Sequence, residues 1–505
     1  MKFQNLASKT AFLLILGSAT VCSLTHADER NPRPTVGSEA VLAQGEGGMV
    51  LVGDRPLVSS TFVNDGTLRV EGRLGHAALS ADLGGETYVY LDVHPAEGLH
   101  PSEAPPLALS LVLDRSGSMI GKRISNALAA ARGMLERLRE GDVVSLVAYD
   151  QTAHLVFPAT VVTRENRGQL VSKLGAIHAQ GETCISCGLE MAVEQLAGRD
   201  SMVKRLVLLS DGEPTVGVKD PRQFQALAER ARDSGVSIRA VGVDVDYNER
   251  VMSAIARGSN GRHSFVDNPS ELYRIFEDEE RALRETVATG AELTLDLAPG
   301  VELVEVFDRA FDRRGRTLRV PLGTFASSDA KTVLVKVRVP HGLSGAQAVA
   351  DVRIRYRDLV LARESESRGA LSLLLRSGEA SPLDPLVAAR LQRSQTADTL
   401  LEINRRFTDG DSDGALRLIE KKRRDLTASS NYAEHAAPAA KRAAVQKDFE
   451  SQRLALDAAA SVFAEPPSAG PIGRGYAAPA AAAPSTRAGK ASVRRNAEAA
   501  DAFGY

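Results

Sequence analysis

Tryptophan is absent from the 505-residue sequence, and aromatic residues together make up only 5% of it. Because proteins often hold single-stranded nucleic acids by stacking bases on aromatic side chains, the composition indicates no such platform. An excess of one charge is also missing, since 62 Lys and Arg face 64 Asp and Glu. A chain so close to neutrality indicates neither nucleic acid nor a strongly acidic surface as its partner.

Long hydrophobic runs are missing after the N-terminal region. No later segment approaches the ~20 consecutive apolar residues of a membrane-spanning helix, so we expect no transmembrane segment. The first residues instead have the form of a secretory signal, in which Lys2 and Lys9 precede an apolar run beginning at Ala11, with cleavage after Ala27. We therefore expect residues 1–27 to direct export to an extracytoplasmic location, which is the periplasm, the cell surface or the medium.

Cysteine is scarce, with three residues in the chain. Cys22 lies in the predicted signal, so Cys184 and Cys187 remain in an oxidising compartment where a disulfide can persist. Their CxxC spacing at a predicted helix start is also one at which the helix dipole can lower a thiol pKa, as in disulfide oxidoreductases. We interpret the pair as a structural or regulatory disulfide, and keep a redox-active protein as an alternative function.

The length of the chain indicates about three domains. An irregular N-terminal segment at 28–59 is followed by a β-rich segment at 60–98. From 106 to 285, apolar strand patterns alternate with amphipathic helix patterns, which is typical of an α/β fold with a doubly wound, mostly parallel sheet. The remaining segments are predicted to be a β-sandwich unit at 290–365, a helical region at 382–463 and a disordered Ala- and Pro-rich tail at 464–505.

Strand patterns lie on both sides of the α/β segment, so we expect this domain to be inserted into one sandwich built from both flanks. The tail has few large apolar groups to bury, and its composition therefore predicts disorder. We interpret the basic residues of the tail as a solubilising patch, which consists of Arg487, Lys490, Arg494 and Arg495.

The most informative stretch reads LALSLVLDRSGSM. A strand pattern leads directly to Asp114, Ser116 and Ser118, which are spaced i, i+2 and i+4. Oxygen ligands alone suit hard cations, so this spacing favours Mg²⁺ or Mn²⁺, with Ca²⁺ as an alternative. Thr183 lies in a glycine-bearing loop before a helix pattern, and Asp211 ends another strand pattern. These loops belong to the edge at which open α/β sheets bind their ligands.

This set of residues resembles the metal-ion-dependent adhesion site (MIDAS) of the von Willebrand factor type A (VWA) family, whose pattern is DxSxS followed by a distant Thr and a distant Asp. The flanking segments are similar to secreted bacterial members described as inter-alpha-trypsin-heavy-chain-like or calcium-activated-chloride-channel-like. The resemblance implies that the five residues hold a divalent metal whose open position accepts an acidic side chain from a protein partner. It therefore implies metal-dependent adhesion or protein binding.

Catalysis is not expected at this site, because no His or Glu stands at motif spacing to act as a general base on a metal-held water. The family often has Gly-Gly-Thr-Asn where this chain has Gly181-Glu182-Thr183-Cys184. This departure predicts a stiffer or redox-sensitive loop. An alternative from another class is a structural envelope or assembly component in which the metal only braces the fold.

A second set of acids has the spacing of an EF-hand calcium loop, namely Asp409, Asp411, Asp413 and Glu420. The residues between Ala415 and Glu420 already have a helical pattern, so a helix–turn–helix with the acids as turn and cap groups explains the same sequence. We therefore keep calcium here as an alternative. Asp244 and Asp246 follow a later strand pattern and are interpreted as loop acids, with a second cation as the alternative.

Overall fold

The computed structural model describes residues 50–51, 56–101, 104–268, 271–463 and 484–504. The chain divides into two units, Met1–Gln44 and Gly45–Tyr505, and the described residues all belong to the second. The predicted signal at 1–27 lies outside the described residues, as does most of the segment at 28–59. The described part of that segment contains two short antiparallel strands, β1 (Val50–Leu51) and β2 (Pro56–Val58). Among the helices of the described residues, none is long and apolar enough to cross a membrane.

A six-stranded sheet with the order β12-β11-β10-β7-β8-β9 forms the α/β domain. Its strands are β7 (Leu107–Asp114), β8 (Val143–Tyr149), β9 (Ala153–Val161), β10 (Val203–Ser210), β11 (Ser237–Val243) and β12 (Arg262–Val266). All neighbours pair in parallel except β9, which adds an antiparallel edge to β8. Every residue of the central strand β7 is buried, as expected for a strand that is covered on both faces.

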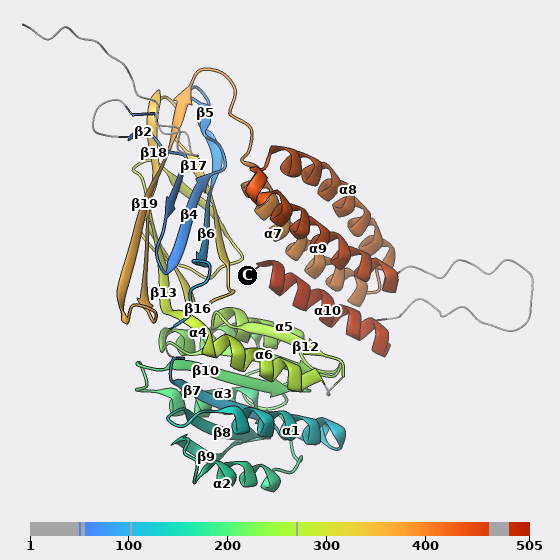
Figure 1. Ribbon diagram of the computed structural model, residues 1–505. Helices are drawn as coiled ribbons and strands as arrows, with labels where there is room; N and C mark the ends of the chain where they lie inside the picture. Colours follow the sequence, from blue (N-terminus) through green and yellow to red (C-terminus); the bar gives the residue numbers. More distant parts are fainter. Residues whose placement is uncertain (1–49, 52–55, 102–103, 269–270, 464–483, 505) are drawn as a thin grey trace, which may run out of the picture. The chain divides into compact units, whose positions relative to one another are not determined.

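Helices cover both faces of this sheet (Figure 1). They are α1 (Lys122–Arg137), α2 (Arg167–Lys173), α3 (Ile185–Leu196), α4 (Pro221–Asp233), α5 (Glu249–Gly258) and α6 (Leu272–Arg284). The apolar stripes of α1, α2 and α6 belong to one buried cluster, and those of α3, α4 and α5 to another. The prediction of a doubly wound, mostly parallel α/β domain is therefore confirmed.

The β-sandwich consists of two sheets, with the orders β15-β16-β13-β18-β19-β5 and β14-β17-β6-β4-β3, around one apolar core. The strands before the α/β domain are β3 (Thr61–Asn64), β4 (Leu68–Leu74), β5 (Ala78–Ser80) and β6 (Gly85–Pro95). Those after it are β13 (Thr286–Leu297), β14 (Glu302–Phe307), β15 (Asp312–Arg314), β16 (Thr317–Ala326), β17 (Lys331–Val339), β18 (Gly345–Asp358) and β19 (Arg363–Arg376). Since β6 pairs with β17 and β5 with β19, each sheet contains strands from both flanks, and the α/β domain is inserted between them.

In the described part of the C-terminal region, four helices share an apolar core (orange to red in Figure 1). They are α7 (Pro385–Thr408), α8 (Ser412–Ala436), α9 (Ala439–Phe463) and α10 (Arg487–Gly504). The prediction of a disordered tail at 464–505 was wrong for residues 484–504, which include α10; residues 464–483 lie outside the described part. Small residues at helical spacing let α10 approach its neighbours closely, so Val493, Ala500 and Phe503 are buried despite the Ala-rich composition.

Candidate metal centre

Three loops meet at the carboxyl end of the sheet, because parallel strands place their carboxyl ends at one edge. The Gly117 amide donates to the Gly181 carbonyl at 3.0 Å, and the Thr215 amide donates to the Thr183 carbonyl at 2.9 Å. Gly181 has a φ of +75°, and an added Cβ would lie 2.0 Å from Oε1 of Gln151. Only glycine fits there, so this position holds the Thr183 loop against the loop that follows β7.

Four of the five predicted metal ligands line one cavity of about 390 Å³. The Ser116 and Ser118 hydroxyl oxygens are 3.0 Å apart, and Ser118 donates to Oδ1 of Asp211 at 2.6 Å. A Cβ added at Gly212 would lie 3.4 Å from the Ser118 hydroxyl oxygen and 3.7 Å from that of Thr183, so these two hydroxyls flank the same point. The structure therefore brings hydroxyl and carboxylate oxygens from all three loops together.

Asp114, the fifth predicted ligand, lies behind this cavity and is fully buried. Its Oδ1 accepts from the Ser116 amide at 2.8 Å, while its Oδ2 accepts from the Ser210 hydroxyl at 2.8 Å and the Tyr149 hydroxyl at 3.2 Å. Burial raises the pKa of Asp114 to about 6, against the lowering effect of the hydrogen bonds from Ser116 and Ser210. With its oxygens held in this way, Asp114 positions the Ser116 loop and supplies negative charge beneath it.

Asp211 is the second buried carboxylate of the site. Burial raises its pKa, although hydrogen bonds from Ser118 and Arg123 and the charge of Arg123 act in the opposite direction. Two carboxylates with raised pKa values, Asp211 lining the cavity and Asp114 behind it, form an environment that a cation would stabilise. This supports the donor set as one that fits a hard divalent metal.

The sequence did not single out Arg123 as part of the site. This residue lies in the first turn of α1, and its Nη1 donates to Asp211 Oδ2 and to the Ser118 carbonyl, both at 2.9 Å. Its Nε donates to Asp244 Oδ2 at 3.0 Å. The guanidinium therefore places a protein cation beside a predicted metal ligand. The position of Arg123 in the sequence could have indicated this contact, because the first turn of the helix after DxSxS lies beside the same loops.

The loop acids Asp244 and Asp246 connect the site to α10. Arg487 donates to Asp244 Oδ1 at 2.6 Å, and Lys490 donates to Asp246 Oδ1 at 2.8 Å. Arg494 pairs with Glu249, and Arg495 pairs with Asp267. The interpretation of the basic tail residues as a solubilising patch was therefore wrong, since all four pair with acids of the α/β domain. Asp244 and Asp246 are loop acids that are paired with basic side chains.

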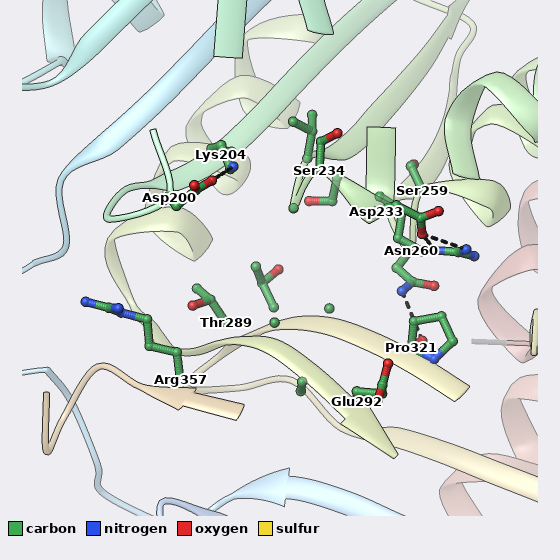
Figure 2. A pocket seen from close by; sticks show the side chains of 18 of the residues that line it. Asp200, Lys204, Asp233, Ser234, Ser259, Asn260, Thr289, Glu292, Pro321 and Arg357 are labelled. Atoms are coloured by element: carbon green, nitrogen blue, oxygen red, sulfur yellow. Dashed lines mark hydrogen bonds and ion pairs between the residues drawn. The ribbon is translucent and has the colours of Figure 1, made fainter. Parts of the chain in front are cut away.

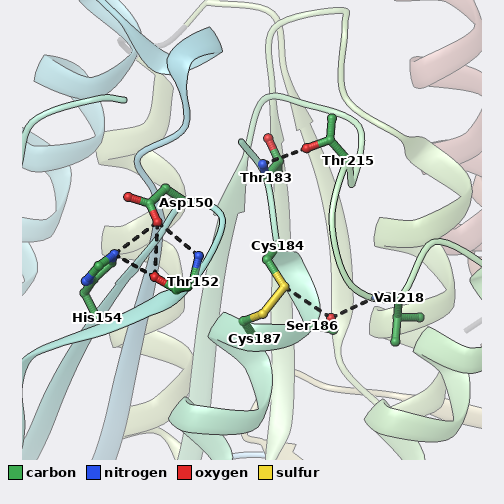
Figure 3. The surroundings of a disulfide bond; sticks show 9 residues. All are labelled: Asp150, Thr152, His154, Thr183, Cys184, Ser186, Cys187, Thr215 and Val218. Atoms are coloured by element: carbon green, nitrogen blue, oxygen red, sulfur yellow. Dashed lines mark hydrogen bonds and ion pairs between the residues drawn. A yellow bond between two sulfur atoms is a disulfide. The ribbon is translucent and has the colours of Figure 1, made fainter. Parts of the chain in front are cut away.

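Cys184 and Cys187 form a disulfide in the first turn of α3, directly after Thr183 (Figure 3). The Cys184 amide donates to the Asp150 carbonyl at 2.7 Å, and the side chain of Cys184 is fully buried. The Thr183 amide donates to the Thr215 hydroxyl at 2.9 Å. The disulfide thus closes the turn that carries a predicted metal ligand, and it takes the place that the family pattern gives to Asn.

The EF-hand spacing does not produce a calcium loop. Helix α8 begins at Ser412, so Asp413 and Glu420 lie within a helix, and Asp411 caps this helix by accepting from the Gly414 amide at 2.8 Å. Asp409 pairs with Arg405, and Glu420 pairs with Arg423. Among the described residues, no group of three or more His, Cys, Asp or Glu could hold a metal. The VWA-type set differs in kind, because it combines two carboxylates with three hydroxyls.

A larger cavity of about 900 Å³ lies elsewhere and shares no lining residue with the metal centre (Figure 2). Figure 2 shows Asp200 and Lys204 on one side of it, with Glu292 and Pro321 on strands of the sandwich opposite. Lys204 pairs with Asp200 at 2.6 Å, and the Asn260 amide donates to the Pro321 carbonyl at 3.0 Å. The hydrogen bond from Asn260 to Pro321 joins the α/β domain to the sandwich, whereas the Lys204–Asp200 pair lies within the α/β domain.

Comparison with known proteins identifies the class of the central domain. Residues 109–278 match the family model described as von Willebrand factor type A domain, so the chain contains a VWA domain. It is 28% identical over 334 residues to an uncharacterized protein from Synechocystis sp., covering 62% of this chain and 77% of that protein. It is 27% identical over 230 residues to inter-alpha-trypsin inhibitor heavy chain H4 from Homo sapiens, covering 44% of this chain. This match spans only 23% of the heavy chain.

Two solved structures show the same fold. A von Willebrand factor type A protein from Catenulispora acidiphila has a TM-score of 0.60 at 17% identity, covering 72% of this chain and 88% of that one. The ArnB paralog VWA2 from Sulfolobus acidocaldarius has a TM-score of 0.53 at 16% identity, covering 79% and 98%. At these identities the likeness concerns the fold alone.

Proposed function

We propose that this chain is an exported, non-enzymatic protein that binds Mg²⁺ or Mn²⁺ and captures an acidic side chain of a protein partner. The observation that carries the proposal is the convergence of Ser116, Ser118, Thr183 and Asp211 in one cavity, above the buried carboxylate of Asp114. Protein–protein interaction is the typical role of VWA domains, to which the central domain belongs. Export rests on the signal-like pattern of residues 1–27.

The donor chemistry favours a hard cation. Ser116, Ser118 and Thr183 offer neutral hydroxyl oxygens, and Asp211 offers a carboxylate oxygen at the same cavity. Mg²⁺ prefers oxygen ligands in octahedral geometry and keeps positions for water or for a partner's oxygen. A metal with so few anionic ligands would keep much of its positive charge, and a carboxylate from a partner could occupy its open coordination position. Since Ser118 is exposed while Thr183 is buried, the cavity is open on the side of Ser118.

Binding is favoured over hydrolysis because the carboxylates at the rim have other roles. Glu213 accepts from the Asn248 amide group at 2.6 Å, and Glu182 lies on the exposed tip of the Thr183 loop. A general base must lie within hydrogen-bond reach of the proton that it removes, and among the described residues neither carboxylate is hydrogen-bonded to a predicted metal ligand.

The first experiment is thermal unfolding of the secreted form in Mg²⁺, Mn²⁺, Ca²⁺ and chelator. A metal at about ten times its dissociation constant should add about 1.4 kcal/mol to the free energy of unfolding. Asp114→Ala should abolish the shift, and the matched control Asp409→Ala, at an acid outside the VWA domain, should retain it. A shift that is unchanged in Asp114→Ala would contradict the assigned site.

Partner capture needs a separate measurement. Peptides bearing Glu or Asp should bind the Mg²⁺-loaded chain and lose binding in chelator, whereas their Gln and Asn counterparts should not bind. If metal stabilises the chain but acidic peptides bind equally with and without it, the metal only braces the fold, and the structural alternative holds. Rapid labelling of Cys184 and Cys187 by thiol reagents without a reductant would instead favour the redox alternative.

A further inference from the structure

A third cavity, of about 410 Å³, lies where three parts of the chain meet. The α/β domain contributes Arg205, Arg239 and Arg262, the sandwich contributes Lys331, and α7 contributes Arg393. In total, seven Arg and Lys line this cavity against four Asp and Glu. Because charges that are drawn out of water need partners, this excess of positive charge at the junction of three parts of the chain calls for an explanation.

The carboxylates of the cavity do not match its arginines one to one. Glu279 serves two of them, with Oε1 at 2.9 Å from Arg205 Nε and Oε2 at 3.9 Å from Arg239 Nη1. Arg239 also donates through Nη2 to the Ser264 hydroxyl at 2.8 Å. Its Nε is buried and has no hydrogen-bond partner among the described residues. A buried guanidinium N–H without an acceptor is costly, and an anion would relieve that cost.

Lys331 adds a further basic group to the wall. Its Nζ donates to the carbonyls of Leu322 and Thr324, both at 2.6 Å, and lies 4.6 Å from the centre of the Phe325 ring. None of these partners carries a negative charge. Burial lowers the pKa of Lys331 to about 7, and the positive charges of Arg309, Arg262 and Arg205 act in the same direction, opposed by Asp329. The basic groups of the cavity therefore repel one another.

We propose that this cavity binds a small multivalent anion of the phosphate class, either free phosphate or a small phosphate monoester. Guanidinium groups present planar pairs of N–H donors that match phosphate oxygens, and several of them converge here. The volume falls within the range of small-molecule sites. The site is independent of the metal centre, since the two cavities share no lining residue. An anion here would join the α/β domain, the sandwich and the C-terminal helices.

Calorimetric titration of the full chain with inorganic phosphate, in chelator to remove divalent metals, tests this site. Arg239→Gln removes the guanidinium whose Nε is unpaired, and Arg262→Gln removes an exposed cavity residue that bonds Asp329 and is less critical for folding. The control is Arg338→Gln, on the same strand as Lys331 but outside the cavity. We expect saturable binding that weakens at least tenfold in both cavity variants and is unchanged in the control.

A parallel titration with glycerol phosphate distinguishes the two sources. Tighter binding of the ester assigns a phosphate monoester, and equal or weaker binding assigns free phosphate. Sulfate at excess should compete with either ligand. The proposal is overturned if neither compound binds saturably, or if Arg262→Gln and Arg338→Gln bind phosphate as the wild type does. A non-saturable rise in thermal stability that is equal in all variants would be a general salt effect and would also overturn it.

Discussion

Arg123 competes with a metal for Asp211, and its replacement should therefore tighten metal binding. Arg123 Nη1 lies 2.9 Å from Asp211 Oδ2, with the Asp211 side chain fully buried and the arginine side chain 26% exposed. A hydrogen bond to a charged group contributes about 1.5–3 kcal/mol, and partial exposure of the arginine places this one near the lower end. A divalent cation that binds Asp211 must weaken this contact, so the binding free energy of the metal is reduced by the cost of doing so.

Arg123→Gln removes the charge but keeps a polar side chain of similar length. Since about 1.4 kcal/mol corresponds to a tenfold change in affinity, we expect the dissociation constant for Mg²⁺ to fall roughly tenfold. The metal-free state should lose on the order of 1 kcal/mol of stability, because Asp211 would remain buried without its cationic partner. The Mg²⁺-saturated state should change less, since the metal replaces that partner.

Calorimetric titration with Mg²⁺ and thermal unfolding in chelator measure both effects. Arg123→Lys keeps the charge but loses the planar fork, so its affinity should lie between those of the wild type and Arg123→Gln. Arg132→Gln changes an exposed arginine of the same helix and should leave Mg²⁺ binding unchanged. If Arg123→Gln binds Mg²⁺ no more tightly than Arg132→Gln, Arg123 is a scaffold for the loops, and the competition argument is refuted.

Three further predictions follow from other parts of the chain. Replacing Cys184 and Cys187 by Ala should cost on the order of 2 kcal/mol in chemical denaturation, from the entropy of closing a short loop, and should weaken Mg²⁺ binding through the Thr183 turn. Arg494→Glu should lower the melting temperature by breaking a largely buried pair, and Glu249→Arg in the same chain should recover part of the loss. Relative to Lys331→Met, the wild type should gain stability as the pH rises from about 7 to 10, by about 1 kcal/mol or more in denaturant titrations. In that window the unfolded chain binds the Lys331 proton and the folded chain, with a pKa of about 7, does not. The charged groups that face Lys331 are Asp329, Arg205, Arg262 and Arg309.

The features that could be predicted from the sequence are those that local patterns carry. Strand β7 is apolar except for Ser110 and its last residue, Asp114, so both the buried strand and the motif at its end were visible. The Thr183 and Asp211 loops were found because each adjoins another apolar element. Parallel pairing then brings these loops to one edge of the sheet, which is a consequence of topology and needs no long-range information from the side chains.

Elements whose burial depends on distant partners were missed. The first half of β19 reads RESESRGA and is largely exposed, and β9 contains Pro158 and mixes exposed with buried residues, so neither has a clear apolar pattern. Helix α10 has small residues where a core helix usually has large ones. Each of these elements is specified mainly by what it pairs with or packs against, which a single-sequence pattern does not record.

The electrostatic surroundings of the metal centre depend on the same kind of distant contact. Arg123 divides its donors between Asp211 and Asp244, and Asp244 also accepts from Arg487 of α10. A cation at Asp211 would weaken the first of these contacts, and the guanidinium would then act mainly on Asp244, where it shares a carboxylate with the tail helix. Asp244 therefore contacts both Arg123, which also binds a predicted metal ligand, and Arg487 of α10. These contacts couple metal binding to the packing of α10, although Asp244 and Arg487 are 243 positions apart in the sequence. Spacing along the chain reveals the metal ligands, whereas the charges that set their affinity come from the fold.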